Sequence, residues 1–137
     1  MSQNSDLVVR LAFAHSRIIK QIDSSLSIHG ISFSEFMVMH NLNNSPGKMM
    51  RRINLAECIG ITASGVTRLL NPMEKRKLVE KEKNPRDARV SLVKLSEAGE
   101  RVFKDMMTSF EQISDSILKP LNVKQIAKLA ELIEFLV

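Results

Sequence analysis

The sequence has little cysteine and no long hydrophobic run. Its 137 residues include a single cysteine, Cys58, so no disulfide can form within the chain and a reducing compartment is expected. No stretch approaches the ~18 consecutive apolar residues that a membrane-spanning helix needs. The polar segment 1–6 is not followed by the basic and apolar parts of an export leader. We therefore expect a cytoplasmic protein with no membrane contact.

The sequence also lacks the motifs of common catalytic and metal sites. It contains no Gly-rich phosphate loop, Cys-x-x-Cys pair, nucleophile elbow or His-Glu-x-x-His. His15, His29 and His40 are not at metal-ligand spacing with one another or with Cys58. We expect Cys58 to be a small core residue in the middle of a helix. The sequence thus predicts no enzyme, no catalytic residue, no metal site and no required cofactor.

The positive charge is concentrated in the middle of the chain. The net charge is +5, and residues 31–99 hold 12 Lys and Arg against 7 Asp and Glu. Residues 1–30 hold three Lys and Arg against two Asp and Glu, and residues 100–137 hold five against six. A basic middle between nearly neutral ends is typical of a domain that meets nucleic-acid phosphates. A solvated basic surface would have the same composition, so charge alone does not decide.

Apolar periodicity predicts a mainly helical chain. The expected helices cover residues 5–29, 32–43, 54–60, 62–76, 96–119 and 122–136. Three of them have the sequence of a capping box at their start, namely Ser32 with Glu35, Asn54 with Glu57, and Asn122 with Gln125. Thr62 is expected to cap the fourth helix.

A small antiparallel sheet is expected to interrupt the helices. A short strand is predicted within residues 48–53, and two longer strands at 78–83 and 88–95, joined by a turn-forming run. In the last strand we expect Val90, Leu92 and Leu95 to face the core, although Val93 breaks the strict alternation.

Residues 54–76 have the spacing of a helix-turn-helix. This motif needs a small residue inside the first helix, a residue that tolerates positive φ at the turn, and an apolar residue inside the second helix. Ala56, Gly60 and Val66 meet these needs in order. The second helix of such a unit enters the major groove of DNA, with its early residues at the base edges.

The outward face of this second helix carries most of the candidate DNA-contacting residues. They are Thr62, Ser64, Thr67, Arg68 and Asn71, joined by Asn54 at the expected start of the first helix. Small hydroxyl residues allow close approach and donate to phosphates, and an arginine can donate two hydrogen bonds to guanine. The alternative is an ordinary solvated helix face, which the preceding turn pattern makes the weaker interpretation.

The loop between the two long strands is the second basic feature. Lys81, Lys83, Arg86 and Arg89 gather around a proline-containing tip, as in the wing of a winged helix, where an arginine can lie in the narrow minor groove. Asp87 stands two residues before Arg89 and can hold its guanidinium. Charged residues guarding an exposed strand edge would explain the first strand, but they would not explain the tip.

Together with these features, nearly the whole chain resembles the MarR family of bacterial winged-helix regulators. The matching segments are Ile31-Ser32-Phe33-Ser34-Glu35-Phe36, Leu55-Ala56, Thr67-Arg68-Leu69-Leu70, Met73-Glu74-Lys75, Leu78-Val79-Glu80-Lys81, Asn84-Pro85-Arg86-Asp87-Ala88-Arg89 and Leu95-Ser96-Glu97-Ala98-Gly99. This chain departs from the family at Ala88, where an arginine is frequent, and at Lys77, where a glycine is frequent. Pro72 also lies within the expected recognition helix.

The resemblance implies a winged helix-turn-helix DNA-binding domain at residues 31–99 and a helical dimerisation region formed by residues 1–30 and 100–137. It implies a homodimer that binds a palindromic operator on double-stranded DNA, in most relatives as a repressor that blocks polymerase. It further implies that Asp87 orients Arg89 into the minor groove, and we expect Arg86 to bind the phosphate that an arginine at the position of Ala88 would bind. A small aromatic or phenolic effector would bind between the dimerisation helices and the DNA-binding part.

Dimerisation also has support from the residues themselves. The chain closes on more large apolar side chains than a small monomer can easily cover, namely Ile126, Leu129, Leu132, Ile133, Phe135, Leu136 and Val137. The first and last helices could instead pack on each other. Two alternatives to DNA binding also stay open, a winged helix used for protein contact and a metal- or thiol-dependent sensor or enzyme built on Cys58.

Overall fold

The computed structural model describes all 137 residues as six α-helices and one three-stranded antiparallel sheet. In chain order the elements are α1 (Gln3–Leu26), the 3₁₀ turn η1 (Ser27–His29), α2 (Phe33–Asn43), the 3₁₀ turn η2 (Pro46–Lys48), β1 (Met49–Arg51), α3 (Arg52–Ile59), α4 (Ala63–Lys75), β2 (Val79–Asn84), β3 (Asp87–Leu95), α5 (Glu97–Leu118) and α6 (Val123–Ile133). This order confirms the predicted winged helix-turn-helix with additional helices. None of the helices combines the length and apolar character needed to cross a membrane.

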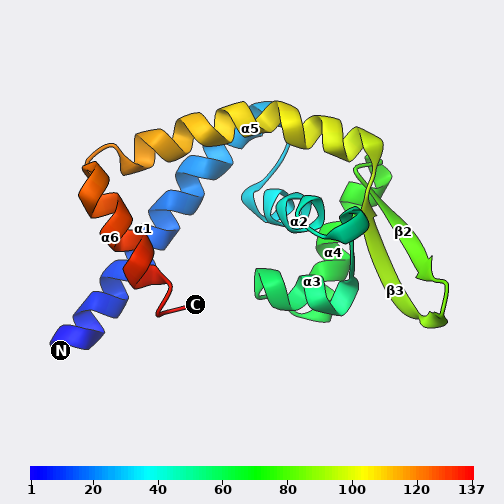
Figure 1. Cartoon of the computed structure of the whole chain (residues 1–137), viewed down its shortest axis with the longest axis horizontal. Coiled ribbons are helices and arrows are strands. Elements are labelled where there is room, and N and C mark those ends of the chain that lie inside the picture. The colour runs from blue at the N-terminus through cyan, green and yellow to red at the C-terminus, as the bar shows by residue number, and fades with distance from the viewer.

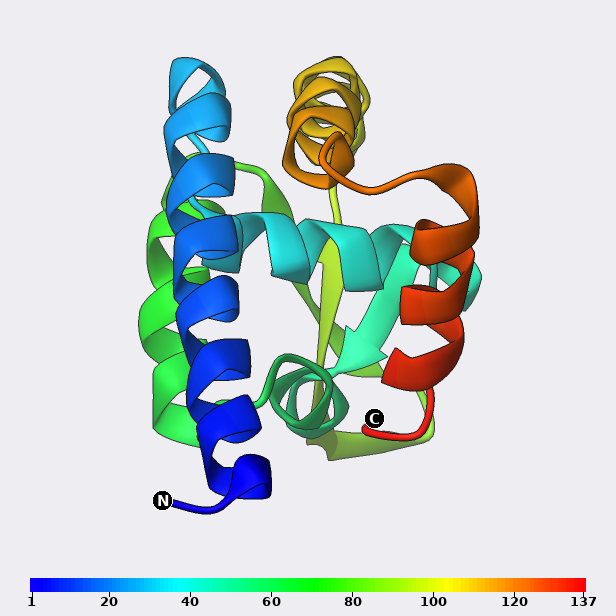
Figure 2. The same ribbon diagram turned by 90° about the vertical axis from the view of Figure 1, so that its left-hand side faces the viewer.

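The long helix α5 connects the two ends of the molecule. It runs along one side, with α2 beneath it and α3 on the far side of α2 (Figure 1). The β2–β3 hairpin projects at one end of α5, while α1 and α6 lie toward its other end. Seen from that end, α1 and α6 stand apart from each other (Figure 2). The hairpin therefore lies at the end of the molecule away from α1 and α6.

A single core holds α2, α3, α4, the sheet and parts of α1 and α5 together. Eighteen buried hydrophobic side chains form one cluster. Four of them lie outside residues 31–99, namely Ile22 and Leu26 of α1 and Phe103 and Met106 of α5. Phe36 of α2 stacks on Phe110 of α5, with their ring centroids 4.3 Å apart. The basic middle of the chain thus completes its core with side chains from both flanking segments.

Two of the three expected capping boxes are present. The Ser32 hydroxyl accepts from the backbone N–H of Glu35, and the Glu35 carboxylate accepts from the backbone N–H of Ser32; Asn122 and Gln125 do the same at α6. The box at Asn54 was a wrong prediction, because α3 already starts at Arg52. Arg51 pairs with Leu92 in the sheet, so the strand runs directly into the helix and Asn54 becomes its third residue.

The core-facing side of β3 also differs from the prediction. Val93 and Leu95 are buried, whereas Val90 and Leu92 are only half-buried. β3 is the central strand, and Val93 lies opposite Met50 of β1 and Lys81 of β2. Because alternate residues of a strand face the same side, burial of Val93 and Leu95 turns Val90 and Leu92 away from the core.

Cys58 does not lie in the core, contrary to the expectation. Its side chain is exposed, whereas Leu55 and Ala56 of the same helix are buried. In a short helix that is buried on one face only, residues 55 and 56 occupy that face and residue 58 lies at its edge.

The end of α4 is a tight turn that brings the chain into the wing. The backbone N–H of Leu78 donates to the Met73 carbonyl at 2.9 Å, and that of Lys77 donates to the Glu74 carbonyl at 3.0 Å. This is the Schellman arrangement, which requires a left-handed residue directly after the C-cap residue Arg76. Lys77 supplies it with φ 62°, at the position where the family frequently has glycine.

We expect Lys77→Gly to raise the free energy of unfolding by about 0.5–1 kcal/mol. A residue with a side chain costs roughly 1–2 kcal/mol in the left-handed region, and the extra freedom of glycine in the unfolded chain offsets part of the gain. The matched variant Lys75→Gly, within the last turn of the same helix, should lower stability by about 0.5–1 kcal/mol. Urea unfolding of both at equal protein concentration tests the difference in sign; a loss of stability in both variants would contradict it.

Candidate nucleic-acid interface

The helix-turn-helix forms as its spacing predicts. Ala56 of α3 is buried, Gly60 in the turn has φ 71°, and Val66 of α4 is buried with 1% of its surface exposed. The backbone N–H of Ile61 donates to the Ala56 carbonyl and closes the turn. α4 therefore crosses close to α3, with one of its faces in the core.

The opposite face of α4 is exposed, as expected. Thr62, Ser64, Thr67, Arg68 and Asn71 are all exposed, whereas Leu70 and Met73 are buried. Thr62 is the N-cap of α4, and its hydroxyl accepts from the backbone N–H of Gly65 at 3.1 Å. The Ser64 hydroxyl lies 3.2 Å from that of Thr62.

Arg52 of α3 contacts this face and was not predicted. Its Nη2 donates to the Thr67 hydroxyl oxygen at 3.1 Å, and its Nη1 lies 3.6 Å from a carboxylate oxygen of Glu74 in α4. The other carboxylate oxygen of Glu74 lies 3.6 Å from Lys81 Nζ in β2. One arginine thus links the start of α3 to two turns of α4, and one glutamate links α4 to the wing.

The predicted wing is present as the antiparallel β2–β3 hairpin. Val79 lies opposite Leu95 at its base, Asn84 lies opposite Asp87 at its tip, and the pairing is irregular between Lys83 and Asn84. At the tip the backbone N–H of Arg86 donates to the Asn84 side-chain oxygen at 2.9 Å. The Arg86 and Arg89 side chains are exposed there.

Asp87 holds Arg89, as the sequence predicts. The Asp87 carboxylate accepts from the Arg89 backbone N–H at 3.0 Å and from Arg89 Nε at 3.2 Å. These two hydrogen bonds, first the one from the backbone and then the one from the side chain, hold the pKa of Asp87 below its usual value, and the charge of Arg51 acts in the same direction. The carboxylate is therefore charged at neutral pH, while 91% of the Arg89 side chain stays exposed to solvent.

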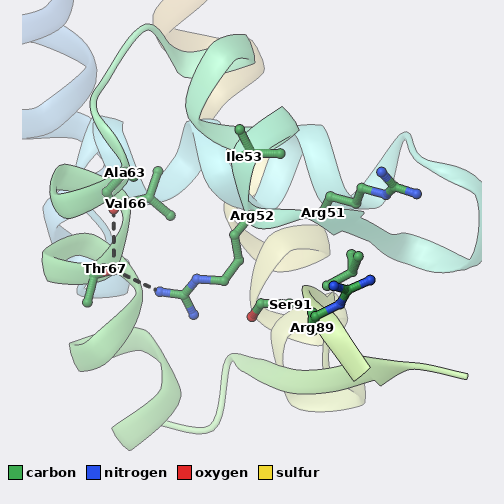
Figure 3. Close-up of a pocket in the computed structure, with 9 residues that line it drawn as sticks. Arg51, Arg52, Ile53, Ala63, Val66, Thr67, Arg89 and Ser91 are labelled. Carbon is green, nitrogen blue, oxygen red and sulfur yellow. Dashed lines mark hydrogen bonds between the residues drawn. The ribbon is translucent and has the colours of Figure 1, made fainter. Parts of the chain in front are cut away.

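A hollow of about 390 Å³ separates α4 from the wing. The residues that surround it are Arg51, Arg52, Ile53, Ala63, Val66, Thr67, Arg89, Val90 and Ser91 (Figure 3). Of the predicted site residues only Thr67 and Arg89 line it; Asn54, Thr62, Ser64, Arg68, Asn71, Arg86 and Asp87 lie elsewhere on α3, α4 and the wing. The adjacent pair Arg51-Arg52 contributes to the basic middle of the sequence, but no motif marks it.

A second cavity, of about 230 Å³, lies between α1 and the helix-turn-helix. It is mainly apolar and is lined by His15, Phe33, Ser34, Met37, Cys58, Ile59, Ile61 and Leu69. His15 comes from α1, and the others come from α2, α3, α4 and the turn. No group of three or more His, Cys, Asp or Glu side chains is placed to hold a metal ion.

A helix-turn-helix followed by a basic two-stranded wing defines the winged-helix class of proteins. Within this class, residues 29–90 match the model of the MarR family, which confirms the resemblance stated from the sequence. The matched segment extends from the end of η1 into β3 and includes α4 and the wing tip.

Solved structures extend this likeness to nearly the whole chain. Sco3205, a MarR family transcriptional regulator from Streptomyces coelicolor in complex with DNA, is 22% identical with a TM-score of 0.88, over 99% of this chain and 87% of its own. A cysteine-to-serine mutant of MarR from E. coli, complexed with operator DNA, is 20% identical with a TM-score of 0.88, over 96% and 94%. BpsR from Bordetella bronchiseptica is 21% identical with a TM-score of 0.84, over 98% of both chains. The fold is therefore that of MarR-family regulators.

Proposed function

We propose that this chain is a cytoplasmic, sequence-specific regulator of transcription that binds a palindromic DNA operator as a homodimer and represses by blocking polymerase. The observation that carries the proposal is the exposed polar face of α4 beside a wing whose arginine is held by Asp87. The DNA complexes of Sco3205 and of the MarR mutant support it, because both proteins share the fold.

Each part of the interface has a role in this proposal. α4 enters the major groove, where Arg68 donates to a guanine and Ser64 and Asn71 reach neighbouring base edges or phosphates. Arg89 enters the adjacent minor groove, with Asp87 fixing its direction. Asn54, Thr62 and Arg86 lie at the rim of this surface and contact the DNA backbone.

We expect Arg68→Ala to cost about 1–3 kcal/mol at one base position and to relax specificity there, since it removes a bidentate hydrogen bond to guanine. Arg89→Ala should weaken binding to all sequences. Mobility shifts with the DNA upstream of the chain's own gene, over a range of salt, measure both effects. The logarithm of the affinity should fall linearly with the logarithm of the salt concentration, by about 0.9 per phosphate contacted.

The control is Arg101→Ala, on α5, which runs along the opposite side of the molecule from α3 (Figure 1). It removes the same charge and should leave DNA binding unchanged. Two results together would favour a winged helix used for protein contact. The wild-type protein would bind no duplex DNA at low salt, and both interface variants would still bind a protein partner.

The terminal helices support the homodimer. α6 has no buried residue within the chain, and only two of the 24 residues of α1 are buried. Since α1 and α6 stand apart (Figure 2), they do not cover each other, contrary to the alternative that the sequence left open. A twofold arrangement would pair these faces and set two copies of α4 for half-sites about 34–36 Å apart.

We expect a mass of about 31 kDa in solution, twice that of the 15.5 kDa chain, because the uncovered apolar faces bury each other. Leu132→Asp places a charge on the exposed apolar side of α6 and should yield a monomer that binds DNA more weakly. Ile53→Asp makes the same kind of change at a 65% exposed residue of α3, outside the terminal segments, and should stay dimeric. Light scattering after size exclusion measures the masses; a wild-type monomer at micromolar concentration would contradict the dimer.

We further propose that the cavity between α1 and the helix-turn-helix binds a small aromatic or phenolic effector that releases the DNA. Its volume of about 230 Å³ exceeds the ~150 Å³ of an engineered apolar cavity that binds benzene. The DNA binding of BpsR, which shares the fold, is regulated by 6-hydroxynicotinic acid. The cavity has the position, between a terminal helix and the DNA-binding part, that the family resemblance implies.

With 6-hydroxynicotinic acid as a probe, we expect a higher melting temperature and a weaker DNA complex, because the ligand binds a folded state that does not favour DNA. Ile59→Phe, which fills the cavity, should lose both effects while still binding DNA. Cys58→Ser should keep both; loss of the response in this variant alone would instead indicate a thiol-dependent sensor. Thermal unfolding and mobility shifts provide the measurements.

A further inference from the structure

The Thr67 hydroxyl is already fully engaged as a donor. A hydroxyl has one hydrogen to donate and two lone pairs to accept with. The Thr67 hydroxyl donates its hydrogen to the Ala63 carbonyl at 3.3 Å and accepts from Arg52 Nη2 at 3.1 Å. A phosphate oxygen can only accept, so Thr67 has no hydrogen left for the phosphate contact that its position on α4 suggests.

Arg52 has the donors that Thr67 lacks. A guanidinium carries five N–H groups in a rigid fork, and in Arg52 one of them is used on Thr67. Arg52 Nη1 lies 3.6 Å from Glu74 Oε1, which is an ion-pair distance but longer than a hydrogen bond. Only 18% of the Arg52 side chain is exposed. The guanidinium is thus held in place at the hollow with most of its donors unused.

The charge of the hollow fits a phosphate group. Arg51, Arg52 and Arg89 line it, and none of its nine lining residues is acidic. Glu74 is shared between Arg52 and Lys81, so this cluster keeps one positive charge, and Arg51 forms no ion pair. The three arginines come from the end of β1, the start of α3 and the wing (Figure 3).

We infer that this hollow receives one phosphodiester group of the DNA backbone, that Arg52 with Arg51 donates to it, and that Thr67 is a positioning residue for Arg52. The inference rests on the proposed DNA-binding function and adds a contact between the recognition helix and the wing. It assigns to Thr67 an indirect role in place of the direct phosphate contact expected from the sequence.

The test is a double-mutant cycle of Arg52→Gln, Thr67→Val and both together. Valine replaces the hydroxyl with a methyl group at nearly the same volume. Arg52→Gln should weaken DNA binding roughly tenfold or more, as expected for a hydrogen bond to a charged group, on every sequence, and lower the salt slope by about 0.9. Thr67→Val should weaken binding less and leave the slope unchanged. In the Arg52→Gln background it should have no further effect, because its only role is gone.

Two outcomes would overturn the inference. If Thr67→Val weakens binding by the same factor with and without Arg52, the hydroxyl itself contacts the DNA. If Arg52→Gln leaves the salt slope unchanged, Arg52 contacts no phosphate. Arg52→Lys keeps the charge but not the fork, so it should restore the slope with only part of the affinity.

The controls distinguish loss of this phosphate contact from loss of folding and from failure of the proposed function. Arg101→Gln removes one charge from α5 and should change neither affinity nor slope, and the melting temperature of every variant shows that it is folded. Wild-type protein without DNA affinity would refute the proposed function itself. Wild-type affinity that depends on Arg68 and Arg89 but not on Arg52 would refute the present inference alone.

Discussion

The direction in which α4 faces depends on one stripe of buried side chains. Val66, Leu70 and Met73 are at most 1% exposed, and full burial of such side chains stabilises by about 1.5–3 kcal/mol each. Turning the helix about its axis would expose part of this stripe and bury Arg68 or Asn71 without partners, at further cost. The packing of three apolar residues therefore decides which polar residues face outward, and the hollow, the wing and their arginines are built around that choice.

Polar contacts hold the end of the same helix. The Arg76 guanidinium pairs with the Glu35 carboxylate, and its Nη1 donates to the Gly30 carbonyl at 2.7 Å. Glu35 also closes the capping box of α2, and the Asp23 carboxylate of α1 accepts from the first N–H of that helix. These contacts link the end of α4 through α2 to the end of α1. A movement of the end of α1 would therefore reach α4 through the start of α2.

Features that depend on residues close together in the chain could be predicted from the sequence. Features that depend on contacts between distant residues could not. The capping box at Ser32, the turn at Gly60 and the Asp87–Arg89 pair each involve residues within a few positions, so their spacing is sufficient to find them. Asn54 was misplaced because a strand paired with β3 sets the start of α3. The role of Arg52 was not predicted because its hydrogen-bond partner Thr67 lies 15 residues away in the sequence. The division into residues 31–99 and two terminal segments stays a prediction, and the core draws side chains from all three.

The junction between the wing and α5 leaves no space for adjustment. A Cβ added at Gly99 would lie 2.1 Å from the Leu78 carbonyl oxygen, and the Ser96 hydroxyl donates to the Lys77 carbonyl at 2.6 Å. α5 starts from this fixed point and continues for 22 residues, a length of about 33 Å at 1.5 Å per residue. The length of α5 therefore sets the distance between the wing and α6. Inserting or deleting one residue in it would swing α6 by about 100° about the helix axis, so its length should tolerate far less variation among homologues than the tip of the wing.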